Sequence, residues 1–179
     1  LTGVFAGFYD LVVRIYSIVI FPITMAVHPH MMSLWNKSKH SDAISILKIA
    51  MLIQVLIFSS IWIVVNLFFE EISYILLWIF SDLNPQYFHL LIPMLVGGFI
   101  WQFALLIHKP MELNRSTHLM LFSIAIALII NLFGNIVLLP KYGLIATAYT
   151  FILSGTFYII SSMIISNSFY KMFFKKSLL

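Results

Sequence analysis

The sequence contains no cysteine, and charged residues fill only 9% of its 179 positions. Without thiols, the chain can form neither a disulfide framework nor a thiolate metal site. Soluble domains carry about 25% charged and about 45–50% apolar residues, whereas 62% of this chain is hydrophobic. A small soluble domain leaves much of its surface in water and could not bury so much apolar area. The composition therefore predicts that most of the chain lies in lipid.

Motifs for covalent chemistry are missing as well. The sequence has no phosphate-binding loop, no nucleophile elbow and no zinc-binding helix motif. Its ten basic residues are scattered singly or in pairs, which does not predict a nucleic-acid surface. We therefore expect neither an enzyme nor a cofactor-binding protein. Residue 1 is Leu and no basic segment precedes the first apolar run, so we expect a piece of a longer protein rather than a signal peptide.

Five stretches of mostly apolar residues are long enough to cross a bilayer as helices, which takes about 20 residues each. They are residues 11–32, 49–69, 87–108, 117–138 and 142–166. The apolar segment 72–80 is too short to span, and its Tyr74 and Trp78 suit the membrane interface. The sequence thus predicts an all-α integral membrane fold, with one transmembrane lobe over residues 1–179 and a basic tail over 167–179.

The positions of the basic residues predict the orientation of these spans. Eight of the ten lie in three segments, which five spans would place on one side of the membrane: 33–48, 109–116 and the tail. Lys and Arg in short loops gather on the cytoplasmic side. We therefore expect the N-terminal end outside and the tail in the cytoplasm. Residues 140–143, between the last two spans, are then predicted to form a tight external turn, because Pro and Gly favour reversals.

Polar side chains inside spans are costly and are therefore candidates for function. Arg14 lies in the first span, four residues after Asp10 and on the same helix face. It either faces a cavity that holds an anionic headgroup, or reaches the interface and pairs with Asp10. Asn131 and Asn135 share a face of the fourth span, beside Gly134. Their amides either join helices or line a polar path.

Several weaker signals accompany these candidates. Three further amides lie in or near the spans as single polar residues, and each either joins helices or lines a polar path: Gln54, Asn66 and Gln102. In the third span, Pro93 and the pair at 97–98 predict a bend or a flexible point.

Histidines gather near the end of the first span. The sequence His28-Pro29-His30, with His40 nearby, resembles a metal site only weakly, because no carboxylate or thiol completes the set at a standard spacing. We expect helix-end histidines there, with Pro29 ending or bending the helix, and no metal site. All six carboxylates lie at or beyond the ends of spans, so no membrane-embedded acid is expected to carry a coupling proton.

A family resemblance covers essentially the whole chain. Residues 131–149, NLFGNIVLLPKYGLIATAY, resemble the signature of the polysaccharide flippases of the multidrug/oligosaccharidyl-lipid/polysaccharide exporter superfamily. That signature has paired asparagines before Pro-Lys-Tyr-Gly and a run of small residues. The stretch from Gly7 to Lys37 is also similar, with Tyr9-Asp10, an Arg one turn later, and prolines at 22 and 29. The chain departs from the family at Ala146 and Thr147, where members often have a second glycine.

The resemblance implies helices eight to twelve of a twelve-helix, two-lobe transporter, so that the first lobe and the seventh helix are missing. It implies a multi-pass protein of the bacterial inner membrane that flips polyprenyl-pyrophosphate-linked oligosaccharide by alternating access, for surface polysaccharides such as O-antigen. It also makes Arg14 a candidate pyrophosphate contact, and Asn131 and Asn135 candidate cavity-lining residues.

Three alternatives stay open. A drug or cation exporter of the same superfamily usually carries a membrane-embedded acid, which this chain lacks. A membrane-bound polysaccharide polymerase or ligase typically has a long external loop with catalytic Arg or His, whereas the longest external connection here covers residues 70–86 without a basic residue. A non-transporting scaffold of five spans would require the chain to be complete.

Overall fold

The computed structural model describes residues 2–79, 85–167, 169 and 171. Within these residues the chain is almost wholly helical and has no strand. The elements, in chain order, are α1 (Thr2–Val19), α2 (Phe21–Asn36), α3 (His40–Leu67), α4 (Phe69–Ile79), η1 (Pro85–Leu90), α5 (Leu91–Ile107), α6 (Lys109–Leu113), α7 (Thr117–Tyr142) and α8 (Leu144–Ile165). Most of the predicted basic tail, with Lys175 and Lys176, lies outside the described residues, as do Phe80 and Asp82.

Four helical segments of the described chain are long and apolar enough to cross a membrane. They are α3 with 28 residues, Pro85–Leu113 with 29, α7 with 26 and α8 with 22. The shortest, at 1.5 Å per residue, measures about 33 Å, against a hydrocarbon core of about 30 Å. The bent pair of α1 and α2 supplies a fifth span if it is counted as one. The protein is therefore an all-α, multi-pass membrane protein.

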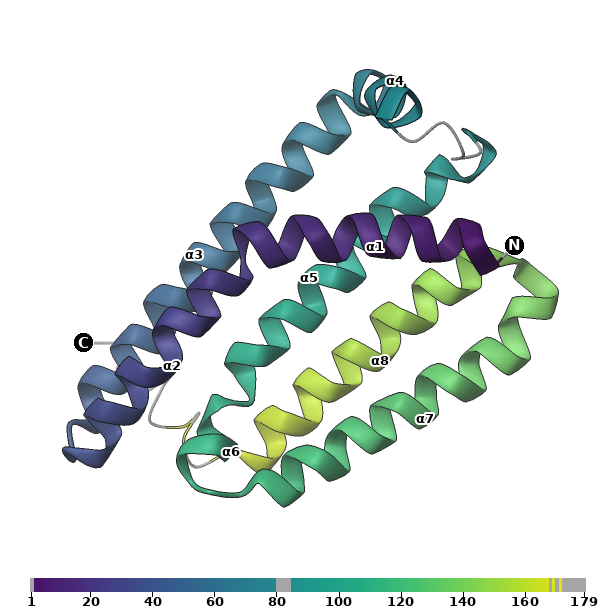
Figure 1. Ribbon diagram of the computed structural model, residues 1–179. Coiled ribbons are helices and arrows are strands. Elements are labelled where there is room, and N and C mark those ends of the chain that lie inside the picture. Colours follow the sequence, from purple (N-terminus) through teal and green to yellow (C-terminus); the bar gives the residue numbers. More distant parts are fainter. Residues whose placement is uncertain (1, 80–84, 168, 170, 172–179) are drawn as a thin grey trace.

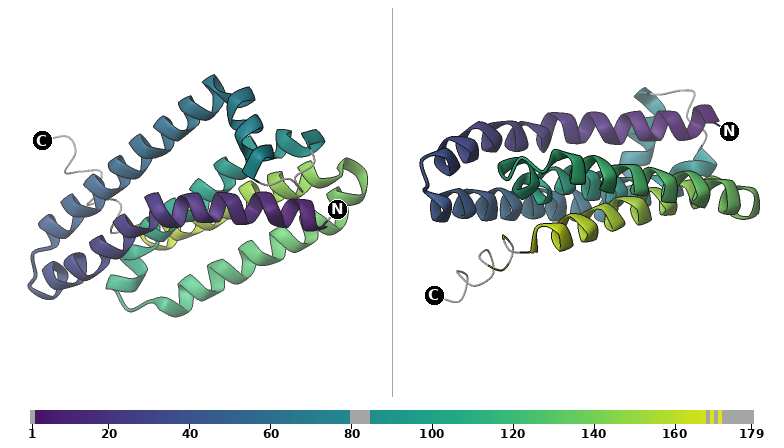
Figure 2. Two further views of the ribbon diagram at one scale, coloured as in Figure 1. Left: turned by 45° about the horizontal axis from the view of Figure 1, so that its top comes forward. Right: turned by 90° about the horizontal axis from the view of Figure 1, so that it is seen from below.

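The helices are arranged so that successive long segments run in opposite directions (Figure 1). α3 and α7 form the two edges, with α5 and α8 between them, and α1 crosses in front of α5. Figure 2 shows α1 and α2 as a layer of their own beside the other helices. The outward face of α7 carries large exposed apolar side chains, including Phe122, Leu128 and Phe133, as expected for a surface in contact with lipid.

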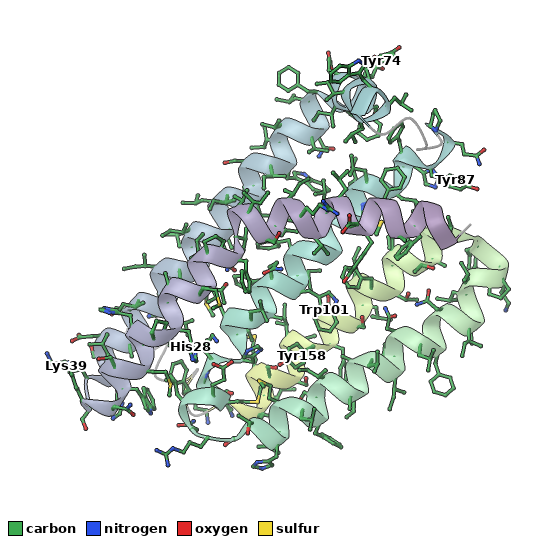
Figure 3. All side chains as sticks on the ribbon, viewed as in Figure 1. His28, Lys39, Tyr74, Tyr87, Trp101 and Tyr158 are labelled. Carbon is green, nitrogen blue, oxygen red and sulfur yellow. The ribbon has the colours of Figure 1, made fainter. Side chains whose placement is uncertain are left out.

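The connections separate into two ends of the bundle. The α2–α3 connection and α6 lie at one end, while α4, η1, the α7–α8 turn and the N-terminus lie at the other (Figure 1). Lys39 and Tyr74 mark these two ends in Figure 3. The basic segments 33–48 and 109–116 therefore share one end, and Glu70, Glu71 and Lys141 lie at the opposite end.

The first predicted span is bent, but not where the sequence suggested. α1 and α2 meet at Ile20 at an angle of 46°. Pro22 is the second residue of α2 and has no N–H to donate to the preceding turn, which explains a break at this point. Pro29 neither ends nor interrupts α2, which continues to Asn36. The prediction that Pro29 ends the helix is wrong, because α2 continues to Asn36. A bend at Pro29 stays a prediction.

The predicted turn at 140–143 is narrower than expected. Pro140 lies inside α7, which continues through Tyr142, and the reversal occurs at Gly143 alone. Gly143 has φ of +69°, a left-handed value that glycine adopts without steric cost. Its N–H donates to the carbonyl oxygen of Leu139 and closes the last turn of α7.

The two adjacent glycines of α5 allow close packing on both sides of this helix. A Cβ atom at Gly97 would lie 2.5 Å from the ring of Phe151 on α8. A Cβ atom at Gly98 would lie 2.7 Å from both Tyr16 and Val12 on α1. Both glycines are fully helical positions within α5, which is one unbroken helix. The structure thus explains this pair, predicted as a bend or flexible point, by helix packing.

The short segment after α3 forms a separate helix. α4 turns away from the direction of α3 and appears end-on in Figure 1. Its Tyr74 and Trp78 are 74% and 87% exposed, so neither ring is held by the rest of the chain. Exposed aromatic rings with a polar tip are typical of the membrane–water interface.

Candidate functional site

Arg14 and Asp10 form an ion pair on the open face of α1. Arg14 Nε donates to Asp10 Oδ2 at 2.7 Å, and the two side chains are 73% and 59% exposed. Ser17, one turn further on the same side, is also exposed and bonds to the carbonyl oxygen of Arg14. The opposite face of α1 is packed, since Val12 and Tyr16 are each 1% exposed. α1 is therefore amphipathic, with a polar stripe of Asp10, Arg14 and Ser17 turned away from the bundle.

The two asparagines of α7 lie at its interface with α8. Asn131 Nδ2 donates to Ser154 Oγ on α8 at 3.4 Å, which is a long contact. Asn135 Nδ2 donates to the backbone and side-chain oxygens of Asn131, at 2.8 and 3.1 Å. Between them, Gly134 approaches Thr150 so closely that a Cβ atom would lie 2.6 Å from its methyl carbon. These contacts join α7 to α8. The buried Asn135 Oδ1 has no hydrogen-bond partner among the described residues.

The remaining predicted polar positions lie in different surroundings. Gln54 is fully buried and donates to Thr24 Oγ1 at 3.0 Å, which joins α3 to α2. Asn66 is exposed and donates to the carbonyl oxygen of Trp62 in its own helix. The Oε1 atoms of Gln54 and Gln102 are buried and have no partner among the described residues. The structure does not bring these amides together with Arg14 or with the asparagine pair.

A buried polar cluster that the sequence did not predict lies where α6 meets α2. At its centre, the Glu112 carboxylate receives three contacts. Lys109 Nζ lies 2.8 Å from Oε2, His108 Nε2 lies 2.9 Å from Oε1, and His28 Nδ1 of α2 lies 3.0 Å from Oε2. The Lys109 side chain is only 9% exposed, and that of Glu112 is 19% exposed. A lysine this deeply buried needs such a counter-charge, since an unpaired buried charge is costly.

The cluster extends from α6 to α8 through His108. The Tyr158 hydroxyl lies 3.0 Å from His108 Nδ1, and both side chains are buried. The ring of Tyr158 also stacks on Trp101, with centroids 5.8 Å apart and an interplanar angle of 18°. Figure 3 shows His28 and Tyr158 towards the end of the bundle where α6 lies. Five side chains, of His28, His108, Lys109, Glu112 and Tyr158, thus connect α2, α6 and α8; we call this set the Glu112 cluster.

Part of this cluster could have been found in the sequence. His108, Lys109 and Glu112 are spaced i, i+1 and i+4, which places them together on one turn of helix. We expected a loop over residues 109–116, so the spacing did not predict a shared helical turn. The structure has the short helix α6 there. His28 and Tyr158 are 81 residues before Lys109 and 50 residues after His108, so only the packing of the helices brings them in.

The histidines that the sequence analysis singled out lie in separate surroundings. Across the described part of the chain, no three His, Cys, Asp or Glu side chains are placed to hold a metal ion. His28 contacts Lys109, His30 is exposed, and the ring of His40 lies against Trp35 with centroids 4.2 Å apart. The Lys109 ammonium occupies the position between His28 and Glu112 where a cation would bind.

Comparisons with protein-family models, curated proteins and solved structures give no match for this chain.

Proposed function

We propose that this chain is part of a membrane transporter that flips polyprenyl-pyrophosphate-linked oligosaccharide between leaflets for surface polysaccharide biosynthesis. The resemblance of residues 131–149 to the flippase signature supports the substrate class. In this proposal the protein lies in the bacterial inner membrane with its C-terminal tail in the cytoplasm, and a first lobe of the same transporter faces the one seen here. No cofactor, metal ion or nucleic acid is required.

The polar stripe of α1 is the observation that carries the proposal. A charged pair facing hydrocarbon would be expensive, so charged side chains in spans face protein or water-filled cavities. The side chains of Asp10 and Arg14 are both exposed on α1 and bond to each other rather than to another helix. In a two-lobe transporter that side of α1 would face the cavity between the lobes, where sugars and pyrophosphate need polar partners. Arg14 would bind the pyrophosphate there, with Asp10 holding its guanidinium in place.

Asn131 and Asn135 have a secondary place in this proposal. Asn131 is engaged with Ser154, which favours a role in joining α7 to α8. Asn135 Oδ1 is buried and has no partner among the described residues, so in this proposal a sugar hydroxyl reaches it only when α7 and α8 move apart during transport. Replacing both with Leu should reduce transport without preventing membrane insertion. Loss of insertion or folding would assign both amides to packing.

The test is an Arg14→Ala substitution in the full-length transporter, expressed in cells whose own gene is deleted. We expect less surface polysaccharide and accumulation of lipid-linked repeat units on the cytoplasmic face of the membrane. Arg14→Lys should retain part of the activity, because it keeps the charge but loses bidentate geometry. Arg115→Ala, in a connection at the α6 end, is the matched control and should behave like the unmodified protein. Normal surface polysaccharide from Arg14→Ala at normal protein levels would contradict the assigned role.

The same deletion separates the rival functions. Loss of a polymerase or ligase would leave single repeat units on the outer face, because flipping would continue. Loss of a drug or cation exporter would change sensitivity to toxic compounds and leave surface polysaccharide intact. Either result would replace the proposed function.

A further inference from the structure

The Nδ1 atom of His28 contacts two groups of the Glu112 cluster, of which one is a hydrogen-bond donor and the other an acceptor. This atom lies 3.2 Å from Lys109 Nζ and 3.0 Å from Glu112 Oε2. An ammonium can only donate a hydrogen bond, and a carboxylate can only accept one. Nδ1 therefore pairs with Lys109 when it is bare and with Glu112 when it carries a proton. The geometry satisfies only one of these contacts at a time.

The other members of the cluster need no change of protonation. His108 is satisfied as a neutral ring, since Nε2–H donates to Glu112 Oε1 and Nδ1 accepts from the Tyr158 hydroxyl. Lys109 donates to Glu112 Oε2 at 2.8 Å whichever partner His28 takes. The bond that changes with a proton is therefore the one at His28 Nδ1.

His28 is also the least enclosed member of the pairwise network. Its side chain is 44% exposed, compared with 7% for His108, 9% for Lys109 and 19% for Glu112. The charged groups that face His28 from α6 are Lys109 and Glu112. The bond between Gln54 and Thr24 sets the alignment of the antiparallel helices α3 and α2. This alignment places Lys48 of α3 at about the same level as His28. Histidine is the side chain that ordinarily changes charge between about pH 5 and pH 8.

We propose that the Glu112 cluster is a proton-binding site in which His28 Nδ1 takes up the proton. Without the proton, Nδ1 accepts a hydrogen bond from Lys109. With the proton, the imidazolium donates to Glu112 and is repelled by the Lys109 ammonium. The proton thus changes which residue of α6 is bonded to α2. This site goes beyond the proposed function and does not depend on what the protein transports.

The experiment is an NMR titration of the intact protein in lipid nanodiscs, with its histidine rings labelled with ¹³C and ¹⁵N. We expect His28 at about pH 8 to have a bare Nδ1, and at about pH 5 to carry protons on both nitrogens. His108 should stay neutral, with its proton on Nε2, at both values. A His28 ring that stays neutral throughout, or a His108 ring that takes up the proton instead, would overturn the proposal.

Two substitutions with opposite expected effects make the test specific. Glu112→Gln should lower the protonated fraction of His28 at intermediate pH severalfold, because the carboxylate that stabilises the imidazolium is lost. Lys109→Gln should raise that fraction, because the repelling ammonium is lost. His30, exposed on the same helix, is the internal control and should respond to neither. A variant that merely unfolds would move His28 towards the behaviour of a free histidine in both cases, so equal shifts in one direction, or none, would contradict the site.

Discussion

The hydroxyl of Tyr16 on α1 donates a hydrogen bond to the carbonyl oxygen of Leu95 on α5, over 2.6 Å. Both residues are 1% exposed. Gly98, one turn further along α5, lets the tyrosine ring approach, since a Cβ atom there would lie 2.7 Å from Tyr16 Cε2. A glycine and a hydrogen bond thus act together to hold α1 against α5.

Removing this hydroxyl should destabilise the bundle modestly. We expect Tyr16→Phe to lower the free energy of unfolding by about 1 kcal/mol, since a buried hydrogen bond is lost while the ring keeps its packing. Unfolding by denaturant in lipid bicelles would measure the change. Tyr149→Phe, at an exposed position of α8, is the control and should change the stability little. Equal effects of the two substitutions would show that the bond to Leu95 contributes nothing.

The hydrogen bond between α2 and α3 permits a double-mutant cycle. Thr24→Val removes the acceptor of Gln54 and leaves a fully buried amide without partners, so we expect a loss of roughly 1–3 kcal/mol. Replacing both residues, as Thr24→Val with Gln54→Leu, should recover most of that loss because no polar group is then stranded. The same unfolding measurement checks both variants. A double variant as unstable as Thr24→Val alone would contradict the explanation.

The contact between α7 and α8 can be tested by adding and removing one methyl group. Gly134→Ala would place a carbon 2.6 Å from Thr150 Cγ2, and overpacking of this kind typically costs about 1–3 kcal/mol. Thr150→Ser removes that methyl group and keeps a hydroxyl that can bond to Thr147 as before. We expect Gly134→Ala to cost much less in the Thr150→Ser background. Equal costs in both backgrounds, measured by thermal unfolding, would place the strain elsewhere.

The absence of cysteine from this chain makes the predicted orientation directly testable, because a single introduced thiol is the only one within these 179 residues. Arg115→Cys lies at the α6 end and Lys141→Cys at the opposite end. In intact cells we expect an impermeant thiol reagent to label Lys141→Cys and not Arg115→Cys. Permeabilised cells, in which both should react, provide the control. Labelling of Arg115→Cys alone would show that the orientation is the opposite of the predicted one.

The fold was largely predictable from the sequence, because lipid imposes a strict rule on the backbone. Each spanning segment must satisfy its own hydrogen bonds as a helix, so long apolar runs predict helices well. What failed was the prediction at prolines. Pro22 breaks the helix, whereas Pro29 and Pro140 lie within helices, and the type of residue is the same in all three cases. The three prolines differ in their place along the helices: Pro22 is in the first turn of α2, Pro29 is inside it, and Pro140 is close to the end of α7. The sequence alone did not fix those helix ends.

The candidate site was less predictable. The ion pair of Asp10 with Arg14, which was one of the two alternatives that their spacing allowed, is present in the structure. The Glu112 cluster did not follow, because its members come from three helices far apart in the sequence. The expectation that all six carboxylates lie at or beyond the ends of spans gave no sign of the surroundings of Glu112, which is partly buried among cationic and neutral partners. Local spacing could indicate the turn from His108 to Glu112, but not the helices that close around it.

The bend at Ile20 gives the two halves of the first helix pair separate supports. α1 is fixed to α5 by Tyr16 and Leu95, whereas α2 is fixed to α3 by Thr24 and Gln54. The bent pair therefore connects two different helices, α5 and α3, instead of lying along one of them. A displacement of α3 therefore acts on α2 through the bond from Gln54 to Thr24, whereas α1 stays bonded to α5 on the other side of the bend.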